Sequence, residues 1–255
     1  MSTNENKGMK AEVTALQAIS AEDRKDWISL AFVQAGICVS VPAFLLGALL
    51  AEAMPIWPAI ISGSLGYLIV VVGMVATGMI GCDLGLASCT CCQAGFGKSG
   101  ARFIVSTIFA VNMIGWFGIQ NGVCGEAFSN AMLAMTGWDI PVVVSNTIWV
   151  IIKLLTAVYG VHALEKLDKI SIPLLMIIMC YGIFLAFKVY GTGNLNDEGT
   201  VQSMSFMSGV ALSFNFTAVG TITGPDYTRF QKSRKDTVKS VFYGVFPMGV
   251  ITLIM

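Results

Sequence analysis

Long apolar stretches, separated by short polar segments, make up most of the chain. A helix needs about 20 apolar residues to cross the hydrocarbon core of a bilayer, and six stretches reach roughly that length. They cover residues 27–51, 56–80, 103–132, 141–161, 170–190 and 206–223. A seventh starts near residue 241 and is still apolar at Met255. The pattern predicts an all-α, polytopic membrane protein with about seven spans, preceded by a polar arm over residues 1–26.

The composition agrees with this prediction. Hydrophobic side chains make up 55% of the 255 residues and charged side chains only 12%, with a mean hydropathy of +0.76. A soluble domain carries roughly 25% charged residues. The 15 basic and 15 acidic side chains cancel, so the chain lacks the basic surface that binds a polyanion. We therefore expect membrane lipid around the protein and no nucleic-acid partner.

Lys and Arg are distributed unevenly between the two sets of loops. Thirteen of the 15 lie in the polar arm and after the second, fourth and sixth spans. Because cytoplasmic loops are enriched in Lys and Arg, we expect a multi-pass protein of the cytoplasmic (plasma) membrane with a cytoplasmic N-terminus. Residues 1–26 lack the apolar core of a secretory signal, so we interpret them as a cytoplasmic arm.

The last apolar segment runs up to the final residue, Met255. A helix end in lipid leaves backbone carbonyls without partners. We therefore expect a chain truncated at its C-terminus, and a natural seven-helix protein with a buried terminus is the alternative.

Two spans carry residues that interrupt a helix. Gly36 and Pro42 lie near the middle of the first span, and the sixth contains Gly220 and the pair Gly224-Pro225. These spans are five helices apart. Transporters with inverted repeats place discontinuous helices at such corresponding positions, with substrate and coupling ion near the breaks. The pattern favours a secondary transporter, and ordinary proline kinks stabilised by Ser or Thr are the alternative.

The third span carries a polar stripe. Asn112, Trp116 and Gln120 recur every four residues and therefore lie on one face of the helix. An indole ring can stack on a flat heteroaromatic ligand, and amides can donate to and accept from its ring N–H and C=O groups. Hydrogen bonding between membrane helices is the alternative explanation.

No pattern in the chain indicates catalysis. Four of the seven cysteines lie in GCDLGLASCTCC at 81–92, but Cys-x-Cys-Cys is not a usual zinc spacing and no His lies nearby. Nucleophile motifs, metal triads and phosphate loops are missing. We therefore expect that the protein is not an enzyme, and that it has neither a metal site at these cysteines nor a covalent cofactor.

Four blocks of sequence carry a family resemblance. They are Gly81-x3-Gly85, Phe96-Gly97-x2-Gly100, GWFGIQ at 115–120 and GTITGPDYTRF at 220–230. Through them, residues 24–255 resemble the nucleobase:cation symporter family of cytosine/purine permeases, most closely its cytosine permeases. The resemblance implies twelve spans, ten of them in a five-plus-five inverted repeat like the leucine transporter fold. Within the domain at 27–255, repeat one would cover about 27–190, and an incomplete repeat two about 204–255.

The resemblance also implies site residues. A planar base would lie between Trp116 and Phe216, and backbone carbonyls of the first span would bind a cation. The other substrate-site positions are Asn112, Met113, Gln120, Asn215, Thr217 and Ala218. The cation positions are Gly36, Val39 and Ser40.

The implied function is a symporter that imports a nucleobase with Na⁺ or H⁺ by alternating access, acting as a monomer. Cytosine is the first expectation. Met113 and Ala218 depart from residues common in cytosine permeases, while Gln120 matches other branches of the family. Another planar heterocycle (a purine, uracil, hydantoin or allantoin) is therefore the alternative, and a channel or receptor is a more remote one.

Overall fold

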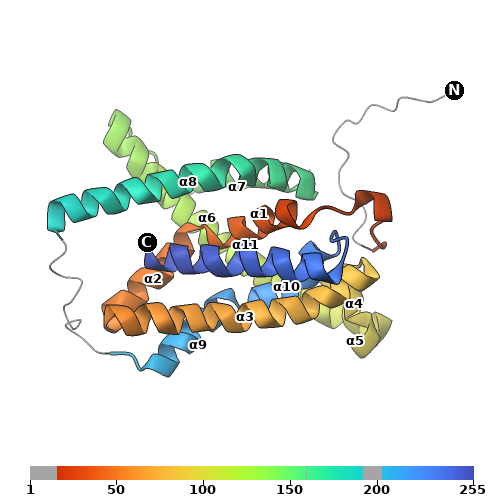
Figure 1. The fold of residues 1–255 in the computed structure, drawn as a ribbon. Coiled ribbons are helices and arrows are strands. Elements are labelled where there is room, and N and C mark those ends of the chain that lie inside the picture. The colour runs from red at the N-terminus through yellow and green to blue at the C-terminus, as the bar shows by residue number, and fades with distance from the viewer. Residues whose placement is uncertain (1–15, 159, 192–202) are drawn as a thin grey trace.

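The computed structural model describes residues 16–158, 160–191 and 203–255, which are almost entirely helical (Figure 1). Residues 1–15 of the predicted arm lie outside the described part. The helices are η1 (Ala21–Asp23), α1 (Trp27–Cys38), α2 (Val41–Ala53), α3 (Ile56–Leu84), α4 (Ser88–Cys91), α5 (Gln93–Gly100), the π-helical turn η2 (Ala101–Val105), α6 (Ser106–Thr136), α7 (Val142–Val158), α8 (Gly160–Tyr190), α9 (Phe206–Thr217), α10 (Val219–Thr228) and α11 (Arg234–Ile254).

Each of the seven predicted apolar segments is helical. Among the described residues, five helical stretches are long and apolar enough to cross a membrane, and α1 with α2, bent by 55°, makes a sixth. The remaining segment, predicted at residues 141–161, is α7, which at 17 residues is shorter than the others. The prediction of an all-α membrane protein with a broken first span is confirmed.

Two helix starts differ from the prediction. Helix α8 begins at Gly160 rather than at residue 170, because the intervening residues are mostly good helix formers such as Leu, Glu and Lys. Helix α11 begins at Arg234 rather than near residue 241. Ser233 caps it by accepting a hydrogen bond from the backbone N of Asp236 at 3.2 Å. Several basic residues that we expected in these loops therefore lie within the two helices.

Helix α3 runs along the lower side of the main bundle in Figure 1 and makes its most extensive contacts. It packs against α9, α10 and α11, and α1 packs against α11 and α8. Tyr67, Met74 and Val241 lie in the buried core that joins these helices. Glycines permit the closest approaches, since a Cβ on Gly81 would lie 2.4 Å from the Cα of Pro225. The order of these contacts brings the first two spans against the sixth and seventh.

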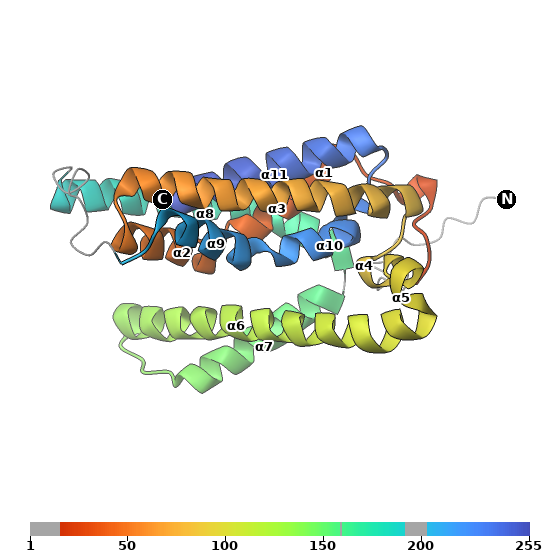
Figure 2. The ribbon, with the colours of Figure 1, turned by 90° about the horizontal axis from the view of Figure 1, so that it is seen from below.

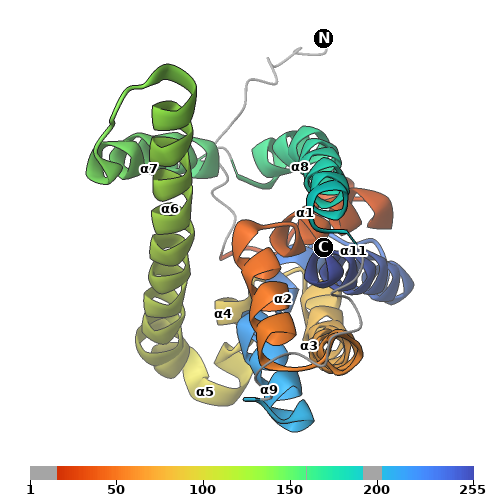
Figure 3. The same ribbon diagram turned by 90° about the vertical axis from the view of Figure 1, so that its left-hand side faces the viewer.

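Helices α6 and α7 form a separate pair that lies beside this bundle (Figures 2 and 3). Their mutual contact is polar as well as apolar. The Asn121 Nδ2 donates to the backbone oxygen of Asn146 at 3.1 Å, and the Ser129 hydroxyl donates to the oxygen of Ile140 at 2.6 Å. The cavity described below lies where α6 faces the bundle.

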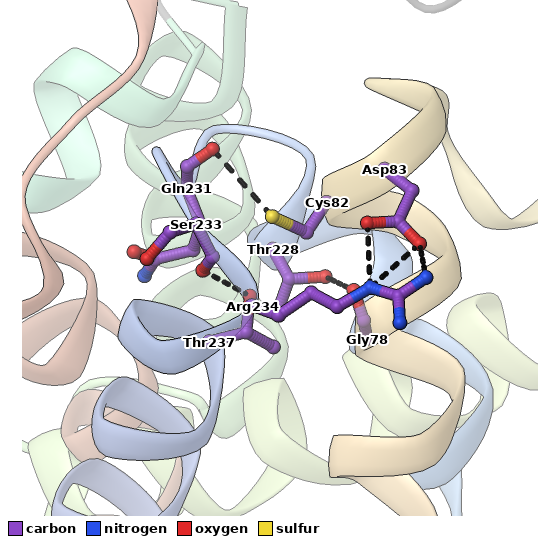
Figure 4. A network of polar contacts seen from close by, with 8 residues as sticks. All are labelled: Gly78, Cys82, Asp83, Thr228, Gln231, Ser233, Arg234 and Thr237. Atoms are coloured by element: carbon purple, nitrogen blue, oxygen red, sulfur yellow. Dashed lines mark hydrogen bonds and ion pairs between the residues drawn. The ribbon is translucent and has the colours of Figure 1, made fainter.

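A polar network ties together the C-terminal end of α3 and the connection from α10 to α11 (Figure 4). The Thr228 hydroxyl donates to the Gly78 carbonyl at 2.7 Å. The Arg234 guanidinium binds both carboxylate oxygens of Asp83. The segment before α1 joins the same network through the backbone N of Lys25, which donates to the Phe230 carbonyl at 2.6 Å. This end of the bundle is therefore closed by contacts between three distant parts of the chain.

Candidate functional site

The break between α1 and α2 leaves backbone carbonyls without their helical partners. The backbone N of Ser40 donates to the Cys38 oxygen at 3.0 Å rather than to the Gly36 carbonyl four residues back. The backbone N of Ala43 donates to the Ser40 oxygen at 2.9 Å rather than to the Val39 carbonyl. Freed carbonyls of this kind are the ligands that discontinuous membrane helices offer to Na⁺.

Ser40 differs from the other two predicted cation positions. Its carbonyl already accepts from the backbone N of both Ala43 and Phe44, at 2.9 and 3.3 Å. Pro42 sits in the first turn of α2, where its missing N–H costs no helical hydrogen bond. The carbonyls of Gly36 and Val39 are therefore less occupied than that of Ser40.

The sixth span is one nearly continuous helical stretch over Phe206–Thr228, and its single irregular residue differs from the place predicted. Ala218 separates α9 from α10, and α10 continues through Gly224-Pro225. Pro225 cannot donate to the carbonyl of Thr221, four residues back. The Thr77 hydroxyl on α3 donates to that carbonyl instead, at 2.6 Å. The helix therefore passes the proline without a break, and the irregular residue Ala218 lies beside Phe216 and Thr217.

A cavity of about 420 Å³ lies between α1, α3, α6, the α9–α10 junction and α11. Several of the predicted site residues line it. They are Gly36, Ser40, Met113, Trp116, Gln120, Phe216 and Thr217.

Four of the predicted site residues do not line the cavity. Val39 is buried beside it at 4% exposure, and Ala218 is half-buried at the helix junction. Asn112 and Asn215 are exposed. The structure thus brings the Trp116, Gln120 and Phe216 positions to one cavity and leaves these four outside its wall.

The Trp116 and Phe216 rings meet across the cavity. Their centroids are 5.3 Å apart and their planes are inclined at 88°, an edge-to-face contact. A planar ligand held between two ring faces requires the rings to be parallel and separated, so one ring must rotate to admit it. In the present state the two rings close directly on each other.

Helix α3 contributes cavity residues that the sequence did not indicate. Tyr67, Val70 and Met74 line one wall, and Phe117 on α6 and Tyr227 on α10 also border the space. An apolar residue on a membrane helix carries no signal of which neighbour it faces. The aromatic residues Phe117 and Tyr227 lie inside the GWFGIQ and GTITGPDYTRF blocks, and that position was the available signal.

The cysteine-rich segment lies near the end of α10. The Asp226 carboxylate accepts from the backbone N and the hydroxyl of Ser88, at 3.0 and 2.7 Å. Burial raises the pKa of the Cys89 and Cys91 thiols, and the Asp226 charge adds to both shifts. Within the described part of the chain, no three His, Cys, Asp or Glu side chains are arranged to hold a metal ion.

A family model described as "Permease for cytosine/purines, uracil, thiamine, allantoin" matches residues 19–255. The chain belongs to this permease family. The resemblance carried by the GWFGIQ and GTITGPDYTRF blocks is therefore confirmed, as is the expectation that the protein is not an enzyme, since the family consists of permeases.

The relatives that match the chain are named for different substrates. The chain is 25% identical over 247 residues to the purine-uracil permease NCS1 of Arabidopsis thaliana, covering 86% of the chain and 41% of the relative. It is 26% identical over 216 residues to the cytosine permease of Escherichia coli K12, covering 83% and 49%. An allantoin permease of Bacillus subtilis is 23% identical over 247 residues, covering 88% and 50%. The chain spans about half the length of the curated relatives it matches.

The fold matches a solved structure. Mhp1, a nucleobase-cation-symport-1 family transporter in a closed conformation with bound bromovinylhydantoin, aligns with a TM-score of 0.86 at 17% identity. The match covers 95% of this chain and 56% of Mhp1. It confirms the leucine-transporter-like fold predicted for the spans that are present.

Proposed function

We propose that this protein is a nucleobase–cation symporter that imports a planar heterocycle by alternating access. The observation that carries the proposal is the cavity where the paired Trp116 and Phe216 rings lie across from the break in α1. An aromatic pair suits a flat, neutral ring system. Discontinuous helices near the midplane are where transporters of this architecture place substrate and ion.

The preferred substrate in this proposal is cytosine, imported with Na⁺, and H⁺ is the second coupling ion. Gln120 lines the cavity and offers both a donor and an acceptor to the edge of a base. Purines, uracil, hydantoin and allantoin present similar edges, and relatives named for cytosine, purine-uracil and allantoin match the chain at 23–26% identity. Gly36 and Val39 carbonyls supply the cation ligands from this part of the chain.

The proposed site keeps the full set of sequence-predicted positions. Trp116 and Phe216 contact the two faces of the heterocycle. Gln120 and Met113 line the site from the third span. Asn215, Thr217 and Ala218 line it from the junction of α9 and α10. Asn112 extends the third-span stripe, and Ser40 supports the cation site through its hydroxyl. The protein functions as a monomer in the plasma membrane with its N-terminus in the cytoplasm, and residues 27–190 and 204–255 belong to successive inverted repeats.

The test is a thermal-shift and uptake comparison on the full-length protein (here the full chain, with any residues that follow Met255) in detergent and in liposomes. We expect cytosine to raise the unfolding temperature more in Na⁺ than in choline, and uptake to show a fixed ratio of substrate to ion. A shift with hypoxanthine or allantoin but not with cytosine would reassign the substrate. Ion conductance without any substrate–ion ratio would instead indicate a channel and would refute the proposal.

A further inference from the structure

A half-buried lysine lies within an apolar helix, five residues before its end. Lys153 is part of α7, whose sequence is VVVSNTIWVIIKLLTAV. Two isoleucines precede the lysine and two leucines follow it. A charged side chain within a membrane span is costly and is retained where it pairs with other groups in the protein or serves transport. The partners of its ammonium group therefore indicate what it does.

The ammonium group points toward α6. Lys153 Nζ donates to the Asn121 Oδ1 at 3.4 Å and lies 5.9 Å from the centroid of the Phe117 ring. Asn121 is 6% exposed, and its Nδ2 donates to the backbone oxygen of Asn146 at 3.1 Å. The cation is thus held by one amide oxygen and by the face of one aromatic ring.

Close packing fixes these groups relative to one another. A Cβ added to Gly125, one turn beyond Asn121, would lie 1.8 Å from the Asn146 side-chain oxygen. The Ser129 hydroxyl, one turn further on, binds the Ile140 carbonyl before α7. Helices α6 and α7 therefore cannot slide past each other without breaking these contacts, and Lys153 keeps its position over Phe117.

Phe117 connects this polar cluster to the cavity. It borders the cavity together with its neighbour Trp116 and with Gln120, one residue before Asn121. A ring held by a cation on its face has fewer orientations open to it than a free ring. The ammonium of Lys153 therefore restricts the Phe117 ring, which borders the cavity, although Lys153 itself does not line the cavity.

We propose that Lys153 is a positioning residue of the substrate cavity, which holds the Phe117 ring in the cavity wall through its ammonium group and through Asn121. The inference rests on the proposed function, because it concerns how the same cavity binds its heterocycle. It predicts that loss of the charge weakens substrate binding, and that the transport rate per protein molecule at saturating substrate stays unchanged.

The experiment compares Lys153→Met with the unmodified full chain in liposomes. The probe is radiolabelled cytosine, uracil or hypoxanthine, whichever the unmodified chain accumulates, and rates are normalised to the amount of protein in the membrane. We expect KM to rise about tenfold, within the range for a desolvated cation–π contact, at unchanged Vmax. Lys153→Arg should stay within about twofold of the unmodified chain, because guanidinium also donates and stacks on aromatic rings. Lys188→Met, in the last turn of α8, is the matched control.

Phe117→Leu supplies a second, independent variant that keeps every α6–α7 hydrogen bond. It should raise KM to a similar extent, and the double variant with Lys153→Met should be no worse than either single one. An unchanged KM in Lys153→Met or in Phe117→Leu overturns the inference, and so does additivity of the two. A lower Vmax and less protein at unchanged KM would make Lys153 a packing residue only. If the unmodified chain accumulates none of the probes, the proposed function fails and this inference fails with it.

Discussion

The Thr77 hydroxyl makes a contact whose energetic role can be isolated. Pro225 in α10 leaves the Thr221 carbonyl without a helical donor, and the Thr77 hydroxyl on α3 supplies one at 2.6 Å. Its contacts to the Gly73 and Met74 carbonyls in its own helix are longer, at 3.1 and 3.3 Å. Thr77→Val removes the hydroxyl at nearly constant shape and leaves the Thr221 carbonyl with no donor.

The expected loss in the free energy of unfolding is about 1–2 kcal/mol. A buried carbonyl left without a donor costs about 1–3 kcal/mol, and measured hydrogen bonds between membrane helices average about 0.6 kcal/mol, with a maximum near 1.7. The assay is reversible unfolding of the full chain in mixed micelles. Thr107→Val is the control, because its hydroxyl donates to the Phe103 carbonyl, one turn back in the adjoining η2, on an exposed face. That variant should change the free energy by less than about 0.5 kcal/mol.

A double-mutant cycle with Pro225→Ala tests the reasoning itself. The alanine backbone has an N–H that can donate to the Thr221 carbonyl, so the cost of Thr77→Val should fall by more than half in the Pro225→Ala background. The loss of the proline ring against Gly81 affects both arms of the cycle and cancels. An equal cost of Thr77→Val with proline or alanine at position 225 would refute the compensation.

Two further outcomes follow from packing and from burial. Gly244→Ala should lower stability by about 1–3 kcal/mol, because its Cβ would lie 2.6 Å from the Ala31 oxygen. Gly115→Ala should raise stability by up to about 1 kcal/mol, because beyond the local helix its Cβ would meet no described atom within 4 Å. Thermal unfolding that moves the same way for both would contradict the packing of α1 on α11. Iodoacetamide should label Cys89 and Cys91 more slowly than free cysteine near neutral pH, and faster as pH rises, because burial raises both pKa values. Labelling is measured by mass spectrometry, and rapid labelling of both thiols near neutral pH would contradict that burial.

Local patterns predicted the helices well and their junctions less well. Gly36 and Pro42 indicated the break in the first span, and the structure places the break between them, with Pro42 in the first turn of the second half-helix. Pro225 looked equally disruptive, but its compensation comes from Thr77, a residue distant in the chain that no local pattern reveals. The capping pair Ser233 and Asp236 was present in the sequence and marks the true start of α11.

The candidate site was predictable only in part, for a similar reason. Spacing along the third span placed Trp116 and Gln120 on one face, and both line the cavity. The pairing of Trp116 with Phe216 came from the family resemblance, since periodicity within one helix cannot identify a partner on another. The contribution of Tyr67 and Met74 from α3 depends on how four helices pack, which no single segment encodes.

We propose above all that the Trp116 face of α6 binds a planar nucleobase. Equilibrium binding of radiolabelled cytosine to the purified full chain, with uracil and hypoxanthine as competitors, tests it most directly. Trp116→Ala should raise Kd at least tenfold, since it removes the ring that meets Phe216 in the cavity. Trp138→Ala, which alters an exposed indole between α6 and α7, should leave Kd unchanged. Binding by Trp116→Ala with the same Kd as the unmodified chain would contradict the account.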